Sequence, residues 1–591
     1  MKYGVKSKSM IMLLPLLAAC SGSDGEAPVA AAPELGTAVA AQSVTQPSAA
    51  IKPLSDFDVW ARRLMADRMS PIVAAAGDLS QAWVGADSRT ANVVVRAPRT
   101  AGKATVAISA PAAGGDATPV FQNAIAQLKK QGGGVLKVAP GEYVFRTLNT
   151  INNSAHLLLT GLADVDIQAT DANFVFQNNA DGIFIQDSQR VRIFGAKMRD
   201  SRFLSGTGRM KLVNGEMRLI LDQPLPDGVS IVGVGPMNEG SRTWPQTQKR
   251  SVFFPGGNQA VRIDSRTFTG PEFKVMPDGQ FVSIKYTYYG NRAVYIRDSY
   301  TGTNEDIVLD GVRIGSIGGI GVLIKSRGRG FAVQNSSFAA DAGRPMSTNF
   351  DGIHVISAAG DILIRGNSIL HTGDDPINLR SIIHKVTALN TNSVTINNDA
   401  RMVRKADELA FFNKSGEYLG RRVVTSAPVI GNSDTVTFGL AAGEPYGEAA
   451  YARDINMTPR RFAVVNNTIA ETVGRGMLIQ VANGLIQNNT LRNLPRTAIR
   501  LLTSFDPWLE GAGAINVRIS NNTIEGGRAE QGFSFVTGII TSIGEVVSAK
   551  IPTNMHNGPL RIDGNKFIAP NTACLALYNA KDVVQQNNTC G

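Results

Sequence analysis

The chain has 591 residues, a length that allows one large core or several domains. Lysine and arginine outnumber aspartate and glutamate and give a net charge of +11. This charge is spread along the chain without a Lys/Arg block, so it does not indicate nucleic-acid binding, although it is compatible with a preference for acidic glycans.

The N-terminus has the layout of a bacterial lipoprotein signal. Three lysines, an apolar run from Met10 to Leu17 and the sequence Leu17-Ala18-Ala19-Cys20 follow one another. Residues 1–20 are therefore predicted to be a signal peptide whose cleavage leaves Cys20 as the lipidated N-terminus, at the outer membrane or in the periplasm. The alternative is an ordinary secretory signal with an incidental cysteine. No second apolar run approaches the length that spans a membrane.

The next segment has little to bury. Residues 21–50 are rich in Ala, Pro, Ser and Gly, which predicts a flexible tether. The sequence pattern of residues 51–115 does not predict a structure for this N-terminal region.

A short helix is predicted where the folded repeat begins. Phe121, Ile125 and Leu128 share one helical face, with Thr118 as a candidate N-cap and Pro119 in the first turn. Alternating short strands follow the glycines at 132–134. A helix in front of such strands is expected to cap the exposed apolar end of a β-helix.

Short β-rich runs then recur with asparagine at their turns, at 364–369, 464–469, 485–491, 517–524 and 583–589. Asn467 and Asn489 are 22 positions apart, which is close to one coil of a parallel β-helix. Asparagine suits the bend because it tolerates left-handed φ, and stacked asparagines can hydrogen-bond to each other. Residues 116–591 are therefore predicted to form an all-β, right-handed parallel β-helix of the pectin-lyase-like kind.

Two stretches interrupt this repeat. Residues from about 203 to 290 and from about 381 to 455 lack the asparagine turns and have short alternating strands. We interpret them as β-rich, barrel-like insertions that wall a binding cleft, because the coils alone present a flat face.

Aligning the coils by their apolar residues brings acidic residues together. The segments that begin at Asp351, Asp375, Arg475 and Thr497 share apolar third and fifth positions, which should point into the core. These four residues then form one column across the coils. The neighbouring outward column contains His354, Asn378, Leu478 and Arg500.

Adjacent coils lie about 4.8 Å apart, so Asp351, Asp374 and Asp375 should perturb one another's ionisation. Such crowding keeps one carboxyl group protonated while another is ionised, as hydrolysis of a glycosidic bond requires. These three residues are the predicted catalytic group. The alternative for the Asp374-Asp375 pair is an Asx turn or a calcium site. Neither a metal nor another cofactor is predicted.

Further residues are candidates for binding substrate. Arg475 is a natural clamp for sugar hydroxyls, His354 is either a binding or a packed residue, and Arg500 belongs to the same outward column. Trp508 can stack on a sugar face and Glu510 can accept its hydroxyls. The alternative for the last two is a buried tryptophan with a surface glutamate.

At these residues the chain resembles glycoside hydrolase family 110. The matching motifs are Asp351-Gly352-Ile353-His354, Gly373-Asp374-Asp375-Pro376-Ile377-Asn378, Gly474-Arg475-Gly476 and Trp508-Leu509-Glu510, in the same order over residues 116 to 570. The resemblance implies an exo-acting, inverting α-galactosidase built as a β-helix with β-barrel insertions. Inversion requires the key carboxyl groups to be roughly 6.5–9.5 Å apart.

One departure from the family pattern concerns specificity. Arg380 stands where the family has histidine, and an arginine facing the cleft would favour a uronate or a sulfated sugar. The double aspartate is also similar to that of polygalacturonases of glycoside hydrolase family 28, but their Gly-His-Gly motif is replaced by Gly474-Arg475-Gly476.

Two alternative functions come from other classes. A polysaccharide lyase that acts on acidic glycans would need a Lys, Arg, His or Tyr base beside charge-neutralising groups, often calcium. A carbohydrate-binding β-helix without activity would tolerate neutral residues in place of the aspartates.

Cys574 and Cys590 are the cysteines that remain after Cys20. In an oxidising compartment they are predicted to form a disulfide that closes a short C-terminal loop. The alternative is two free thiols.

Overall fold

The computed structural model describes residues 71–591, apart from 152, 242, 246–251, 254–259, 288–289, 398–399, 432–434, 506–507, 512, 529–537, 546–556, 571, 579 and 581. The predicted signal peptide, Cys20 and the tether at 21–50 lie outside the described residues. Among the residues that are described, no helix is both long enough and apolar enough to cross a membrane.

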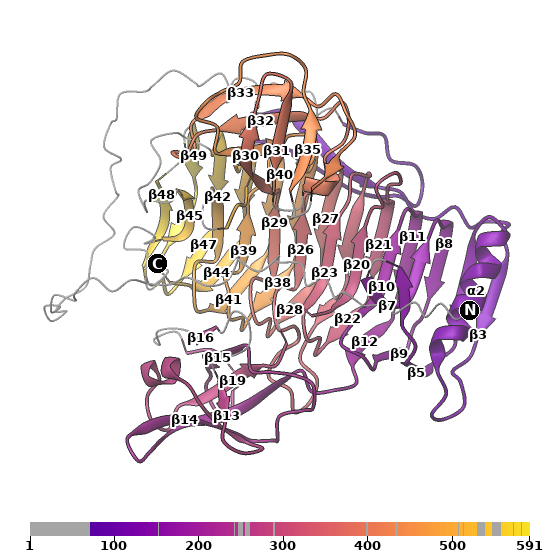
Figure 1. The fold of residues 1–591 in the computed structure, drawn as a ribbon, viewed down its shortest axis with the longest axis vertical. Helices are drawn as coiled ribbons and strands as arrows, with labels where there is room; N and C mark the ends of the chain where they lie inside the picture. Colours follow the sequence, from indigo (N-terminus) through magenta and orange to yellow (C-terminus); the bar gives the residue numbers. More distant parts are fainter. Residues whose placement is uncertain are drawn as a thin grey trace, which may run out of the picture.

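The predicted right-handed parallel β-helix is confirmed (Figure 1). Successive strands of one coil go to three different sheets, so that neighbours within a sheet come from successive coils. We number the sheets 1 to 3 and give their strands in spatial order. A parallel pairing of this kind requires crossover connections, which are right-handed in nearly all proteins.

Sheet 1 carries the candidate site and consists of β48 (Ala573–Leu577), β45 (Gly538–Glu545), β42 (Ile499–Ser504), β39 (Met477–Ile479), β29 (Ile377–Arg380), β26 (Ile353–Ile356), β23 (Ile320–Lys325), β20 (Arg292–Arg297), β10 (Asp181–Gln186), β7 (Asn153–Thr160) and β6 (Asn149–Ile151). Sheet 2 consists of β3 (Thr105–Ile108), β4 (Gly134–Val138), β8 (Ala163–Gln168), β11 (Gln189–Phe194), β21 (Glu305–Asp310), β24 (Phe331–Gln334), β27 (Asp361–Arg365), β37 (Arg461–Val465), β40 (Gly484–Gln487), β43 (Val517–Ser520), β46 (Leu560–Asp563) and β49 (Val583–Gln586). Sheet 3 consists of β5 (Gly141–Phe145), β9 (Ala172–Phe176), β12 (Lys197–Asp200), β22 (Arg313–Gly315), β25 (Ser337–Phe338), β28 (Ser368–Leu370), β38 (Thr468–Ala470), β41 (Thr490–Leu494), β44 (Thr523–Gly526), β47 (Lys566–Ile568) and β50 (Thr589–Cys590).

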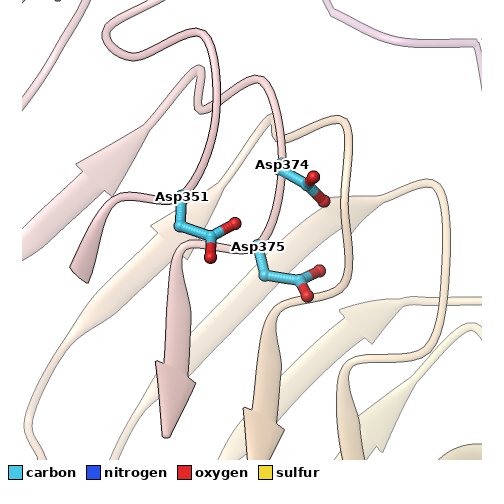
Figure 2. A group of neighbouring side chains, drawn as sticks. All are labelled: Asp351, Asp374 and Asp375. Carbon is cyan, nitrogen blue, oxygen red and sulfur yellow. The ribbon is translucent and has the colours of Figure 1, made fainter. Parts of the chain in front are cut away.

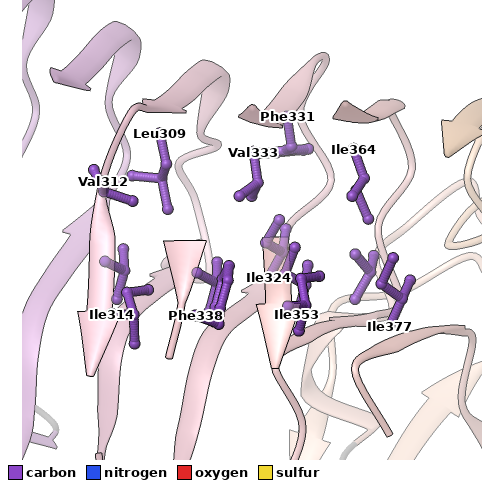
Figure 3. Packing of buried hydrophobic residues seen from close by; sticks show 14 of the residues in the cluster. Leu309, Val312, Ile314, Ile324, Phe331, Val333, Phe338, Ile353, Ile364 and Ile377 are labelled. Atoms are coloured by element: carbon purple, nitrogen blue, oxygen red, sulfur yellow. The ribbon is translucent and has the colours of Figure 1, made fainter. Parts of the chain in front are cut away.

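The core is a column of aliphatic and aromatic side chains between the three sheets (Figure 3). Ile353 and Val355 of β26 and Ile377 and Leu379 of β29 have no exposed surface. Their alternation along each strand is the one that the sequence predicts. It fixes which residues of these strands face outward, and these include His354 and Asn378.

Helix α2 (Ala117–Lys130) caps one end of the solenoid, as predicted (Figure 1). Phe121, Ile125 and Leu128 join the solenoid core. The N-cap is Asp116 and not the predicted Thr118, because the Asp116 carboxylate accepts hydrogen bonds from the backbone of Thr118 and, across the turn, from Thr147. A carboxylate at this position also meets the positive end of the helix dipole.

The region left open by the sequence contains a hairpin and the first solenoid strand. β1 (Leu79–Val84) and β2 (Thr90–Val95) form the hairpin, whose Trp83 and Val93 pack on the outer face of sheet 2. β3 already pairs with β4, so the solenoid includes residues before position 116.

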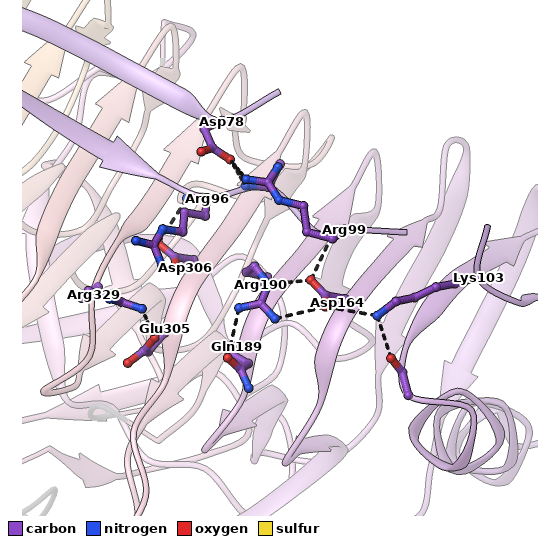
Figure 4. A network of polar contacts seen from close by, with 12 residues as sticks. Asp78, Arg96, Arg99, Lys103, Asp164, Gln189, Arg190, Glu305, Asp306 and Arg329 are labelled. Carbon is purple, nitrogen blue, oxygen red and sulfur yellow. Dashed lines mark hydrogen bonds and ion pairs between the residues drawn. The ribbon is translucent and has the colours of Figure 1, made fainter. Parts of the chain in front are cut away.

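Ion pairs fasten this N-terminal segment to sheet 2 (Figure 4). The Asp164 carboxylate accepts from the backbone of Arg99 at 2.9 Å and from Lys103 Nζ at 3.1 Å, and it also pairs with Arg190. Asp306 accepts from the backbone of Arg96 at 3.1 Å. Two strands of sheet 2 that are separated by β11, namely β8 and β21, thus supply these acceptors along the path of the segment.

An asparagine ladder runs along one bend of the solenoid, between sheets 2 and 3. Each member donates from Nδ2 to the Oδ1 of the next at 2.9 Å, in the order Asn367, Asn467, Asn489, Asn522, Asn565 and Asn588. The residue before each member has left-handed φ and is asparagine in four coils and glycine in two, Gly366 and Gly564. The ladder confirms the expected asparagine stacking and includes Asn565, whose run the sequence analysis did not single out.

Two antiparallel seven-stranded sheets form the insertions, each around its own apolar core. The first consists of β13 (Ser205–Val213), β14 (Glu216–Leu221), β15 (Gly233–Pro236), β16 (Val252–Phe253), β17 (Val261–Arg262), β18 (Thr267–Thr269) and β19 (Phe281–Lys285), with the 3-10 helix η1 (Pro271–Val275). The second consists of β30 (Ile383–Leu389), β31 (Ser393–Ile396), β32 (Glu408–Phe412), β33 (Tyr418–Val423), β34 (Val429–Ile430), β35 (Val436–Gly439) and β36 (Tyr451–Asp454), with the 3-10 helix η2 (Ala400–Met402).

The insertions lie at opposite ends of the sheet 1 strands (Figure 1). The first leaves the solenoid between β12 of sheet 3 and β20 of sheet 1, and the second leaves it between β29 of sheet 1 and β37 of sheet 2. Sheet 1 is therefore the face of the solenoid that both insertions flank. At the far end of the chain, Cys574 of β48 and Cys590 of β50 form a disulfide.

We predict that Asn489→Ala lowers the free energy of unfolding by about 3 kcal/mol, because it leaves the Asn467 amide and the Val464 carbonyl without their partners. Differential scanning calorimetry measures the change as a lower Tm. The exposed neighbour Thr490→Ala is the matched control and should leave the Tm unchanged. Equal Tm values for the two variants would show that the ladder contributes little.

Candidate active site

Three successive turns that lead from sheet 3 into sheet 1 carry the three predicted catalytic aspartates and Arg475, which is predicted to bind substrate. Asp351 precedes β26, Asp374 and Asp375 precede β29, and Arg475 precedes β39. The register pairs His354 with Asn378, Asn378 with Leu478 and Leu478 with Arg500, which is the predicted outward column. Backbone hydrogen bonds from Gly352 to Asp375 and from Gly476 to Thr497 continue the same register into the turns.

The three aspartates meet in one cluster (Figure 2). One carboxylate oxygen of each lies within 4.8 Å of those of the other two. Asp351 and Asp375 are buried, whereas Asp374 is partly exposed and so is the member that solvent can reach.

The register explains this closeness, because it stacks Asp375 directly beside Asp351, one coil away. Inversion at the anomeric carbon stays a prediction.

Among the three aspartates of the cluster, Asp375 is the one that is most tightly held by a cation. Its Oδ1 accepts the backbone N–H of Arg475 at 2.7 Å, and its Oδ2 lies 3.2 Å from Arg475 Nη1. Burial raises the pKa of Asp375, and the Arg475 charge opposes this rise. Arg475 thus contacts both oxygens of Asp375, an arrangement that favours the ionised form of this carboxyl group.

Gly474 makes this contact possible. A Cβ at this position would lie 2.6 Å from Asp375 Oδ1 and 2.6 Å from the Asp375 backbone nitrogen. Glycine is therefore the residue that lets the coil of Arg475 approach Asp375. Gly474 belongs to the motif Gly474-Arg475-Gly476, but the sequence of this motif alone does not indicate the role.

Asp374 has a different environment. Among the described residues, none donates a hydrogen bond to its carboxyl group. Burial raises its pKa, and the Asp351 charge adds to the rise. Lys285, Arg496 and Arg475 act in the opposite direction. The net effect is a raised pKa, so Asp374 holds a proton more tightly than an exposed aspartate does.

Lys285 reaches the cluster from the first insertion. It is buried on β19, and its Nζ donates to the Gly373 carbonyl at 2.6 Å and lies 4.6 Å from the centre of the Phe350 ring. Lysine in an alternating strand gives no sequence signal of such a role. The sequence predicts that the insertions contribute to the site. The hydrogen bond from Lys285 to Gly373 is one specific contact of this kind from the first insertion.

Asp351 is flanked by an amide and an imidazole. Asn378 Nδ2 donates to Asp351 Oδ2 at 3.4 Å, and His354 Nδ1 lies 2.6 Å from the same oxygen. The imidazole contact is close but poorly aligned as a hydrogen bond, which is common for catalytic contacts before substrate binds. Burial raises the pKa of Asp351 well above its ordinary value, and the Asp375 charge adds to the rise.

A buried polar chain continues from His354 away from the aspartates. His354 Nε2 accepts from Arg380 Nε at 2.9 Å, Arg380 Nε lies 3.2 Å from Glu510, and Glu510 accepts from Gln480 at 2.9 Å. Burial, together with the Arg380 charge, lowers the pKa of His354 to about 3. The imidazole is therefore neutral at working pH, with Nδ1 carrying its proton.

The buried polar chain of contacts changes the interpretation of three predicted binding residues, which are His354, Arg380 and Glu510. His354 and Glu510 are buried, and the Arg380 side chain is only 11% exposed. Arg380 is paired with Glu510 because the antiparallel bridges of Glu510 with Ile382 and Ser504 bring it over the end of β29. The structure thus holds these three residues behind Asp351, and the Arg380 charge is already neutralised.

The remaining predicted binding residues are farther from the aspartates. Arg500 is fully buried on β42, two strands beyond Asn378, and so does not face solvent as predicted. Trp508 is half-buried in the loop closed by the Ser504–Glu510 bridge. Its stacking on a sugar stays a prediction.

The three aspartates are also a possible site for a divalent cation, since each offers an oxygen. However, Arg475 contacts both oxygens of Asp375, and Lys285 and Arg496 add positive charge beside Asp374. The donor set therefore fits a cluster that shares protons better than it fits a bound cation, and we assign no metal.

No family model matches this chain, and no curated protein matches it. Among solved structures, it is similar to the A-module of a mannuronan C-5 epimerase from Azotobacter vinelandii, with 11% identity over 81% of this chain and 94% of that one and a TM-score of 0.37. A polygalacturonase from Erwinia carotovora ssp. carotovora has 11% identity over 84% and 94% and a TM-score of 0.37. An alginate lyase from Paenibacillus sp. str. FPU-7 has 10% identity over 82% and 99% and a TM-score of 0.34. Likenesses this distant carry no argument about activity, and the three names cover three different reactions.

We predict that Asp374→Asn stabilises the fold at neutral pH. The folded state holds the Asp374 proton more tightly than the unfolded state, whose value is near 3.8, so wild-type stability falls as pH rises above that value. The variant lacks this cost, and its advantage should shrink as pH falls toward 3.8. Tm measured across this pH range tests the slope, with the exposed Asp171→Asn as control. A wild-type advantage at neutral pH would contradict the raised pKa.

Proposed function

We propose that this chain is a glycoside hydrolase that acts on a poly- or oligosaccharide. The observation that carries the proposal is the close approach of a partly exposed carboxyl group, Asp374, to a carboxyl group whose two oxygens are both contacted by Arg475, Asp375. Hydrolysis of a glycosidic bond needs an acid and an ionised carboxylate at the same bond.

In the proposed reaction, Asp374 gives its proton to the glycosidic oxygen as the bond between this oxygen and the anomeric carbon breaks. Asp375 stabilises the positive charge that develops on the anomeric carbon. Water then supplies the hydroxyl group to this carbon, and its remaining proton returns to Asp374. The histidine chain behind Asp351 orients that third carboxyl group. Proton NMR of the first-formed anomer distinguishes retention from inversion.

The finer proposal is exo action on a terminal α-galactosidic or related bond. It is supported by the order of the motifs around Asp351, the Asp374-Asp375 pair and Arg475, which resembles that of glycoside hydrolase family 110. A polygalacturonase-like hydrolase, a polysaccharide lyase and a non-catalytic carbohydrate-binding β-helix are the competing functions.

We predict that Asp374→Asn and Asp375→Asn each lower turnover by at least about a hundredfold, because each removes one half of the acid–carboxylate pair. Reducing-sugar release from α-galactosides, uronate oligomers and sulfated galactan oligomers is the assay, with mass analysis of the products. Circular dichroism should show an unchanged fold. Asp171→Asn, at an exposed carboxyl group, is the matched control.

The outcomes separate the competing functions. Products with ultraviolet absorbance from an unsaturated sugar would identify a lyase. Binding without any product would identify a binding protein. Wild-type turnover in both aspartate variants would refute the catalytic assignment.

We also propose that the protein is exported and anchored by lipid at Cys20, on the basis of the signal-like residues 1–20. We predict that Cys20→Ala abolishes labelling with radioactive palmitate and moves the protein from the membrane fraction to the soluble fraction. Cys574→Ala, a change at a cysteine far from the signal, should leave the labelling intact. Equal labelling of wild type and Cys20→Ala would reject the anchor.

A further inference from the structure

In three successive coils, segments of the same length connect the start of a sheet 3 strand to the start of a sheet 1 strand. The register pairs Ser368, Thr468 and Thr490 at the start of the sheet 3 strands, and Ile377, Met477 and Ile499 at the start of the sheet 1 strands. Left-handed φ occurs at the same place in each turn, at His371, Glu471 and Asn493. The turns therefore stack residue on residue.

This stacking aligns Asp374, Gly474 and Arg496, each of which stands three positions before the paired strand residue. Asp374 and Arg496 thus lie on two coils with one middle coil between them. Each of these two coils is about 4.8 Å from the middle coil. The residue of that middle coil is a glycine, so no side chain stands between the proposed acid and the arginine.

Arg496 differs from the other arginines of the site. Arg475 is paired with Asp375, and Arg380 with Glu510. Arg496 is partly exposed, and within the part of the chain that the structure describes its side chain has no ion pair or hydrogen bond. Its charge nevertheless acts on both Asp374 and Asp375. An unpaired cation beside a proposed catalytic acid is available for a charge that the substrate brings.

We propose that Arg496 binds an anionic group of the substrate, a carboxylate or a sulfate, on a sugar unit seated over Gly474 beside Asp374. This inference rests on the proposed function and names its substrate class. A planar guanidinium matches the two oxygens of such groups. The charged and titratable groups around the subsite are Asp351, Asp374, Asp375, Arg475, Lys285 and Arg496. The anion preference that the sequence analysis attached to Arg380 is thereby assigned to a different residue.

The experiment uses two matched pairs of substrates. An α-linked oligogalacturonate is compared with its methyl ester, and a sulfated galacto-oligosaccharide with its desulfated form, so that the members of each pair differ only at the charged group. The protein variants are Arg496→Gln and Arg496→Lys. Arg492→Gln is the control, because it removes an exposed positive charge four positions earlier, in β41. Both kcat/KM and the Kd from titration calorimetry are measured.

We expect the wild type to prefer the charged member of at least one pair. Arg496→Gln should reduce this preference by about 10- to 100-fold, the effect of one charged hydrogen bond or pair of them. Arg496→Lys should retain part of it, Arg492→Gln all of it, and added salt should weaken it. The pair that responds identifies the anion as carboxylate or sulfate.

Two results would overturn the proposal. One is an equal loss for the charged and uncharged members in Arg496→Gln, and the other is a wild type that does not prefer the charged member. Charge-dependent binding through Arg496 without hydrolysis would support the subsite but reject the hydrolase. Hydrolysis without any charge preference would support the hydrolase but reject the anion subsite.

Discussion

Parallel hydrogen bonding between successive coils is the constraint on which the site depends. It sets the spacing of the coils at about 4.8 Å and leaves each residue directly beside its counterpart in the next coil. Any polar residue that recurs at one position is thus forced against its neighbours. At the bend the result is the asparagine ladder, in which each amide satisfies the next. At the turns into sheet 1 the result is three carboxyl groups within 4.8 Å, which do not satisfy each other.

The close approach of three carboxyl groups destabilises the fold, and the surrounding residues show how this destabilisation is limited. Two of its members are buried, so like charges in close contact would be strongly destabilising if all three ionised. Arg475 neutralises Asp375, and Lys285 and Arg496 add positive charge beside Asp374. His354 stays neutral because it is buried and because Arg380 donates to its Nε2. The cluster therefore persists with unequal members, and this inequality is what acid–base chemistry uses.

Residues that repeat with the coil were predictable from the sequence. The inward positions, the outward column from His354 to Arg500 and the meeting of Asp351 with the Asp374-Asp375 pair all follow from aligning coils of similar length. Contacts from outside the repeat were not. Lys285 belongs to an insertion whose path no periodicity describes, and Glu510 reaches Arg380 through a loop closed by isolated bridges. The predicted exposure of Arg380 and Arg500 was wrong for the same reason. Periodicity indicates the face from which a side chain projects, but it does not indicate which residues cover that face.

The disulfide has a consequence for the outermost coil. β48, β49 and β50 are the outermost strands of their three sheets at this end, so each has a neighbour on one side only. Such strands are the natural place for a solenoid to begin peeling apart. The Cys574–Cys590 link joins β48 to β50 and so ties the first strand of the coil to its last. Under oxidising conditions the terminal coil must detach as one closed ring and not strand by strand, which converts a gradual fraying into a single cooperative event.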